Sequence, residues 1–277
     1  MQITVRDNIM ATIGAAAGQF ARQVPFAAAR ALTRSAVAAR AAAQAEIRRV
    51  FDRPTPFVTN GVRYEMTTKA EVAGGVAAAR VFISDDANKG VSPRQVLAAQ
   101  LAGGERRLKR FESAMVRLGL LANTEALVPA KGRSDLLDQY GNVRASLIVQ
   151  LLSYFQAFGE QGYKANMTAA RRNRLARFGR SESGNRTIGG KVYFWSRGPG
   201  RWTGAGSWKA GRSQHLARGI WEKSGTFGAN VKPVLLAVRG VRYQRRLDFV
   251  GVVRKSVAKT FPDNFRASWA DAVRSAR

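Results

Sequence analysis

Five arginines within ten residues are the side chains of this chain best suited to a chemical role: Arg171, Arg172, Arg174, Arg177 and Arg180. A guanidinium group is a planar fork that binds phosphate or carboxylate through two hydrogen bonds. If residues 169–178 are helical, Arg171, Arg174 and Arg177 form a slanted stripe that could follow a phosphate backbone. We therefore predict a surface that binds nucleic acid or an acidic protein. A charged face that only interacts with solvent is the alternative.

Further basic and aromatic residues extend this candidate surface along residues 164–212. The arginines are Arg186, Arg197, Arg201 and Arg212, and the aromatic residues are Tyr193, Trp195 and Trp202. An aromatic ring in a basic region can stack on a nucleic-acid base. The alternative, equally open from the sequence, is that these rings form the core of a small sheet. The segment is long and lacks clear periodicity, so we predict a basic helix end followed by an arm or hairpin loop.

The charge of the whole chain supports an anionic partner. The 277 residues include 46 Lys+Arg and 18 Asp+Glu, which gives a formal net charge of +28. Residues 161–277 hold 25 of the basic and 5 of the acidic side chains, so most of the excess lies there. Self-repulsion on this scale opposes compaction, and a polyanion or an acidic protein surface is expected to offset it.

The residue types of catalytic and metal sites form no recognisable group. The chain has one histidine, His215, and no cysteine. The glycine-rich run at residues 189–190 lacks the Ser or Thr and the spacing of a nucleotide-binding loop. The pairs Asp85-Asp86 and Asp135/Asp138 have the pattern of turns rather than of a cation site. We predict no catalytic residue, no metal site, no cofactor and no enzymatic activity.

The elements that would carry these residues indicate an α+β fold, because the predicted helices and strands occur in separate runs. We expect long N-terminal helices, central helices, and a C-terminal antiparallel sheet with terminal helices. Four segments follow: an N-terminal helical segment (1–53), a mixed α/β core (54–160), a basic Arg/Gly/aromatic arm (161–215), and the sheet with the C-terminal helices (216–277).

The N-terminal segment should contain a strand at residues 2–5, a helix ending near residue 24, and a long helix at 26–51. Eleven of the nineteen residues from 27 to 45 are alanine. Alanine favours helix and lets another backbone come close. We therefore expect the alanine face, including Ala38 and Ala42, to pack tightly against the first helix or against a helix of a neighbouring subunit.

Further elements are predicted from caps and periodicity. The strands are expected at residues 62–67, 76–83, 217–222 and 232–238. The helices are expected from Ser92-Pro93 to Gly103, at 105–118, from Asn142 through 158, and at 249–261 after Asp248, with a last helix opening at Pro262. No apolar run reaches the length of a membrane-spanning helix, so no membrane contact is predicted.

The chain resembles the Z-type tail-completion family of minor tail proteins of long-tailed bacteriophages. The resemblance rests on short motifs across most of the chain: Ser92-Pro93, Gly103-Gly104 with Arg106, Lys109 and Glu112, Gly119, Asp138, Gly141-Asn142, the run from Ile148 to Ser153, Gly219-Ile220-Trp221, the run from Lys232 to Leu235, Tyr243 and Phe249. Residues 164–212 match least.

The resemblance implies a structural virion protein that acts late in tail assembly, at the head–tail neck. It implies a homo-oligomeric ring around the DNA path. The expected partners are the tail terminator, tail tube or head–tail connector proteins, and the genomic DNA end. The expected location is the virion, with the host cytoplasm during assembly. A free-standing nucleic-acid-binding protein is the alternative.

Overall fold

The computed structural model describes residues 2–6, 23–86, 90–176, 178–180, 186–199, 201–202, 208–209, 215–226 and 228–275. The chain divides into two compact units. Unit 1 comprises Met1–Gly104 and Tyr243–Arg277, and unit 2 comprises Glu105–Arg242. Each unit has its own hydrophobic core. The helix predicted before residue 24 falls on residues 7–22 and lies outside the described residues.

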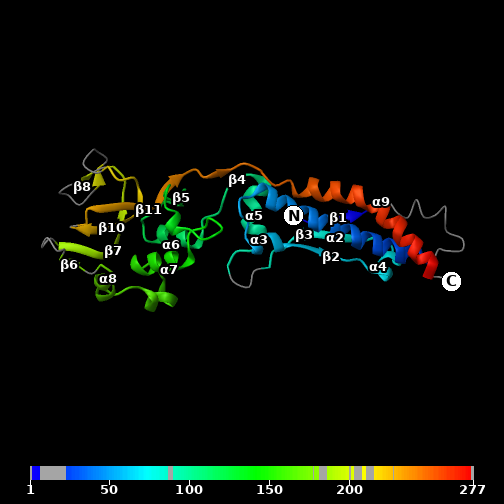
Figure 1. The fold of residues 1–277 in the computed structure, drawn as a ribbon, viewed down its shortest axis with the longest axis horizontal. Coiled ribbons are helices and arrows are strands. Elements are labelled where there is room, and N and C mark those ends of the chain that lie inside the picture. Colours follow the sequence, from blue (N-terminus) through cyan, green and yellow to red (C-terminus); the bar gives the residue numbers. More distant parts are fainter. Residues whose placement is uncertain are drawn as a thin grey trace. The chain divides into compact units, whose positions relative to one another are not determined.

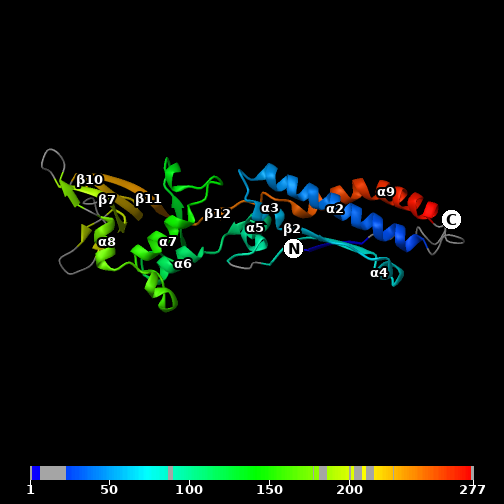
Figure 2. The same cartoon turned by 60° about the horizontal axis from the view of Figure 1, so that its bottom comes forward.

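Unit 1 combines two long helices with a small sheet. Helices α2 (Val24–Val50) and α9 (Phe249–Ser275) lie side by side, as Figures 1 and 2 both show. The sheet has the order β1-β3-β2 and is antiparallel, with β1 (Gln2–Arg6), β3 (Ala78–Ile83) and β2 (Val62–Glu65). Burial alternates along β3, and its buried residues join α2 in the core.

Both small and large side chains are buried where α2 and α9 pack together. Ala39 and Ala43 of α2 are almost fully buried, as are Ser268 and Ala272 of α9, and larger residues of α9 pack against the same core, among them Phe261 and Phe265. A polar contact occurs near the middle of the two helices, where Asn264 Nδ2 donates to Ser35 Oγ over 3.0 Å. Such contacts require closely spaced backbones, which small side chains permit. The predicted close packing of the alanine-rich helix is confirmed, but its partner is α9, which the sequence analysis did not propose, and Ala38 and Ala42 are only half-buried.

Shorter elements of unit 1 begin and end at recognisable signals. Helix α5 (Pro93–Ala102) has Ser92 as its N-cap, with Ser92 Oγ accepting from Gln95 N over 3.2 Å. It ends at Gly103, whose φ is 75°. Helices α3 (Pro56–Asn60) and α4 (Lys69–Ala73) flank β2. Where the chain passes between the units, β4 (Gly104–Glu105) pairs with β12 (Arg242–Tyr243).

Unit 2 is built on a five-stranded antiparallel sheet of order β5-β11-β10-β7-β6. Helices α6 (Arg110–Arg117) and α7 (Ala145–Tyr154) supply Phe111, Met115, Leu147 and Leu151 to its core. Short helices η1 (Ser134–Leu136), η2 (Glu160–Ala165) and α8 (Ala169–Leu175) complete the unit. The strands are β5 (Glu125–Pro129), β11 (Asn230–Arg239), β10 (Gly219–Thr226), β7 (Arg186–Ser196), β6 (Phe178–Arg180) and the separate pair β8 (Arg201–Trp202) and β9 (Trp208–Lys209).

The α+β fold class is confirmed, but three predicted elements were wrong. The arm predicted at residues 164–212 contains β7, which is an interior strand of the sheet. The helix predicted at 105–118 begins only at Arg110, because β4 and a loop precede it. The break predicted at Pro262 does not occur, since α9 continues through this exposed proline. The two units also divide the chain differently from the four predicted segments.

Among the described residues, no helix is both long and apolar enough to cross a membrane.

Candidate polyanion-binding surface

Helix α8 presents the first three arginines of the predicted cluster. Thr168 caps it, with Thr168 Oγ1 accepting from Arg171 N over 3.3 Å. Leu175 packs against the core of unit 2 and Ala176 is buried, so this side of the helix faces inward. Arg171 and Arg174 are exposed, and Arg172 is half-buried. The helix prediction for this segment is therefore confirmed for residues 169–175.

The α8 arginines have no carboxylate partner among the described residues. Most of the chain's 18 carboxylates are already used in intramolecular ion pairs elsewhere. Three of these carboxylates serve more than one cation: Asp271 lies near Arg30, Arg34 and Arg274, Glu125 near Arg218 and Arg239, and Glu222 near Arg133 and Lys191. An anion for α8 would therefore have to come from another molecule or from residues outside the described part of the chain.

The other predicted arginines are only partly placed. In the register of β6 and β7, Arg180 lies opposite Arg186, so the fold brings these two positions together. Arg201 lies in β8, opposite Lys209 of β9. Arg197 is exposed just after β7 and has an interaction of its own. Arg177 and Arg212 lie outside the described residues.

Tyr193 and Trp195, the two aromatic residues of β7 that were predicted to stack, both pack within unit 2. Tyr193 is only 4% exposed and packs edge-on against Tyr154, with ring centroids 5.3 Å apart. Burial, with a contribution from the Glu222 carboxylate, raises the pKa of Tyr193 to about 12. Trp195 is half-buried, and the Arg218 guanidinium lies 5.5 Å from its ring centroid. The sheet-core interpretation therefore applies to Tyr193, whose buried ring a base could not reach, whereas the stacking role of Trp195 stays a prediction.

Trp202 lies in β8 opposite Trp208, in a part of the chain where only the backbone is described. Its predicted stacking role stays a prediction.

The acidic pairs considered from the sequence have structural roles. Asp85 Oδ1 accepts a hydrogen bond from the N-cap residue Ser92 over 2.5 Å. Asp135 pairs with Arg133 over 2.8 Å. Asp138 Oδ1 accepts from the backbone N–H groups of Tyr140 and Asn142, which closes a turn. Within the described part of the chain, no group of three or more His, Asp or Glu side chains could hold a metal ion.

The sequence analysis missed a buried carboxylate that organises unit 2. Glu112 is 1% exposed and accepts hydrogen bonds from Arg106 Nη1, Lys109 N and Leu127 N at 2.7, 2.7 and 2.9 Å. Burial raises the pKa of Glu112, but these hydrogen bonds outweigh it and hold the pKa below its usual value. A usable signal was the position of Glu112 at the third residue of α6, where a carboxylate can cap the helix.

Comparisons with protein families, with characterised proteins and with solved structures gave no match.

Proposed function

We propose that this protein is a non-enzymatic structural subunit of a tailed-phage virion, which completes the tail at the head–tail neck and contacts the genomic DNA end through α8. The observation that carries the proposal is the set of three α8 arginines with no described carboxylate partner, in a chain of net charge +28. The sequence resemblance to Z-type tail-completion proteins supplies the place of action. Arg106, Lys109 and Glu112, which carry part of that resemblance, meet at the buried carboxylate of unit 2.

The position of Arg171 supports a binding role over a merely solvated face. It is the third residue of α8 and lies in the first helical turn, where the helix dipole disfavours a cation by about 0.3–1 kcal/mol. Arg172 and Arg174 lie in the last turn, where the dipole favours a cation, so the cost falls on Arg171 alone. A sequence that only needed solubility could place the Arg171 charge at a less costly position. A phosphate backbone beside α8 would convert this local cost into a favourable interaction.

The DNA contact is tested by the salt dependence of binding. Replacing Arg171, Arg172 and Arg174 by Ser should leave the fold intact, because none of the three is fully buried. Each lost phosphate contact should flatten the slope of log K against log salt by about 0.9 for duplex DNA, so three contacts give roughly 2.7. The measurement is a titration of a short duplex at several salt concentrations.

The matched control removes the same charge elsewhere. Arg254, Lys255 and Lys259 of α9 are exposed and have no ion-pair partner among the described residues, so their replacement by Ser also lowers the net charge by three. If the α9 variant flattens the slope as much as the α8 variant, binding follows net charge and α8 is not the site. An unchanged slope in the α8 variant would exclude its arginines as phosphate contacts.

The assembly role is tested with particles made without this protein. Heads and tails should then fail to join or fail to deliver DNA, and added protein should restore infectivity in proportion to its amount. A structural subunit is used once per site, so rescue should saturate at a few copies per particle, about six by analogy with ring-forming oligomers. Rescue at far less than one copy per particle would contradict a structural role. Particles that are complete without the protein would favour the free-standing nucleic-acid-binding alternative.

A further inference from the structure

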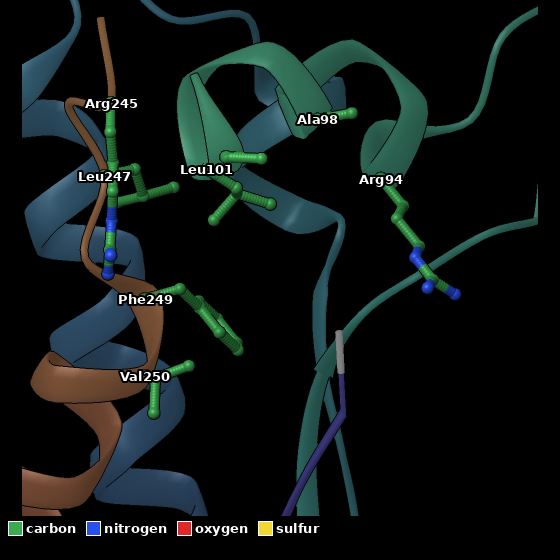
Figure 3. Close-up of a pocket in the computed structure, with 8 residues that line it drawn as sticks. Arg94, Ala98, Leu101, Arg245, Leu247, Phe249 and Val250 are labelled. Atoms are coloured by element: carbon green, nitrogen blue, oxygen red, sulfur yellow. The ribbon is translucent and has the colours of Figure 1, made fainter. Parts of the chain in front are cut away.

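A cavity of about 360 Å³ lies within unit 1, between α5 and the beginning of α9 (Figure 3). Its lining is mostly apolar: Ala98, Leu101, Ala102 and Val250 are the accessible apolar residues, and Leu247 and Phe249 lie buried beneath them. In Figure 3, Phe249 and Leu101 extend into the space between the two helices. Two arginines also belong to the lining, Arg94 on α5 and Arg245 on the segment that precedes α9. The cavity therefore combines apolar walls with two cations.

The walls of this cavity are held in place by the fold. Leu247 and Phe249 are each 1% exposed and belong to the hydrophobic core of unit 1. The carbonyl of Gln100 on α5 accepts hydrogen bonds from Arg246 N and Leu247 N over 3.0 and 3.2 Å, which fixes the segment against the helix. Gly103, which ends α5 beside this segment, has a φ of 75°, a left-handed conformation that glycine adopts without strain. The site is thus formed before any ligand arrives.

The two arginines remain able to bind an external carboxylate. Arg94 Nη1 lies 3.6 Å from Asp85 Oδ2, and Arg245 Nη2 lies 2.7 Å from Asp248 Oδ1. Their side chains are 46% and 58% exposed. Exposed ion pairs of this kind contribute little stability, because both ions stay well solvated. A guanidinium group has five donors, so it can hold a second carboxylate without losing the first.

We propose that this cavity binds an apolar side chain of an acidic segment on a partner protein, with flanking carboxylates of that segment bound by Arg94 and Arg245. The apolar lining fits a leucine or phenylalanine side chain, and an acidic segment matches both the two arginines and the net charge of +28. A nucleic acid fits less well, because Phe249 is buried and offers no open ring face for a base. The site lies in unit 1, whereas α8 lies in unit 2, so this inference does not rest on the proposed function.

The test uses three synthetic hexapeptides in calorimetric titrations of the full chain. The probe is acetyl-Glu-Asp-Leu-Phe-Asp-Glu-amide. In the second peptide serine replaces the Leu-Phe pair, and in the third glutamine and asparagine replace the acids. We expect only the first peptide to bind measurably, because the site requires both an apolar side chain and carboxylates. Equal binding of the first and second peptides would mean attraction to net charge alone and would overturn the proposal, as would no binding of the first.

Matched variants locate the binding. The double variant Arg94→Gln/Arg245→Gln should lower the affinity for the first peptide by roughly tenfold or more, since two charge-assisted contacts are lost. The control Arg63→Gln removes a similarly exposed, ion-paired arginine outside the cavity and should change nothing. Ala98→Trp should fill the cavity and abolish binding, whereas Ala258→Trp on the exposed part of α9 should not.

We expect peptide binding at this cavity to be independent of DNA binding by the α8 arginines. The variant with Ser at positions 171, 172 and 174 should bind the peptide as the unmodified chain does, and Ala98→Trp should leave the salt slope of DNA binding unchanged. Peptide binding that survives Ala98→Trp, or that is lost with the α8 arginines, would overturn the assignment to this cavity. Circular dichroism of each variant verifies the fold, which Ala98→Trp should retain because Ala98 is exposed.

Discussion

At the scale of single residues, Glu112 shows how this basic chain uses its few carboxylates. Its two oxygens join the Arg106 side chain, the first turn of α6 and the backbone of β5. A buried carboxylate is costly unless it is paired and fully hydrogen-bonded, and here it is both. Glu125 and Glu222 are similarly buried and paired with arginines of unit 2. Part of the arginine excess therefore stabilises the fold, and the exposed remainder is available for partners.

Replacing Glu112 by Gln should destabilise unit 2 by about 3–5 kcal/mol, because the largely buried guanidinium of Arg106 would lose its carboxylate partner. The measurement is the urea midpoint followed by tryptophan fluorescence. The control Glu46→Gln breaks an i,i+3 pair with the exposed Arg49 and should change the free energy of unfolding by no more than about 0.5 kcal/mol. Equal effects of the two variants would contradict the role given to Glu112.

The same variant has a predictable pH dependence. The pKa of Glu112 is lowered in the folded protein, so its stabilising contribution is present above the unfolded pKa of about 4.3 and is lost as the pH falls through the folded value. The difference in unfolding free energy between the unmodified chain and Glu112→Gln should therefore shrink at acidic pH. Urea titrations at neutral pH and at successively lower pH values test this. A difference that stays constant over that range would show that the carboxylate charge is not responsible.

The site residues could be predicted only where their surroundings did not matter. Arg171 and Arg174 of α8 are exposed as expected, and Arg172 is half-buried, because the inward side of this helix is formed by Leu175 and Ala176. The sequence could not assign Tyr193 and Trp195 to the core or to a binding surface, because an aromatic residue suits both equally well. Their roles depend on α7 and on Arg218, which are distant in sequence.

At the scale of elements, the α2–α9 pair depends on small residues at particular positions. Ala39→Leu should destabilise unit 1 by about 1–3 kcal/mol, because Ala39 is fully buried and its neighbours leave no room for a larger side chain. Ala41→Leu makes the same substitution on the exposed side of α2 and should have an effect within about 0.5 kcal/mol. Thermal unfolding of both variants gives the comparison. Equal effects would mean that the cost arises within α2 itself and not at its interface.

Elements with strong local signals could be predicted, and those decided by distant contacts could not. Helix α5 begins at Ser92-Pro93 and ends at Gly103, as its cap residues indicate. Strand β7 was missed because Gly189 and Gly190 interrupt its pattern. A Cβ at Gly190 would collide with the carbonyl of Leu175 on α8, so glycine is needed there for packing rather than for a loop. Helix α9 was broken in the prediction because Pro262 removes a hydrogen bond, a cost that packing against α2 outweighs.

At the scale of the whole molecule, the two separate cores should make the two units respond independently to a core mutation. Phe249→Ala should lower the free energy of unfolding of unit 1 by about 3–5 kcal/mol, since the side chain is 1% exposed and packs in the core of that unit only. Amide hydrogen exchange should show faster exchange in α2 and unchanged exchange in β10. Equal acceleration in both elements would contradict independent cores.

The division into units could not be read from the sequence, because unit 1 is discontinuous. Its first part ends at Gly104 and its second begins at Tyr243, and no local composition marks these two positions as neighbours. The predicted segment 216–277 joined β10 and β11 to α9, although β10 and β11 belong to unit 2 and α9 to unit 1. Contacts between α2 and α9 span more than 200 residues, as the hydrogen bond between Asn264 and Ser35 shows.

The discontinuity of unit 1 also sets an order of events during synthesis. The ribosome makes the chain from its N-terminus, so residues 105–242 are complete before α9 exists. Unit 2 can therefore fold first, while α2 still lacks α9, the helix that packs beside it in the complete chain. A nascent chain would carry the α8 arginines in folded form but would lack the α5–α9 cavity. The cavity proposed to bind an acidic segment would thus form only after α9 has been translated.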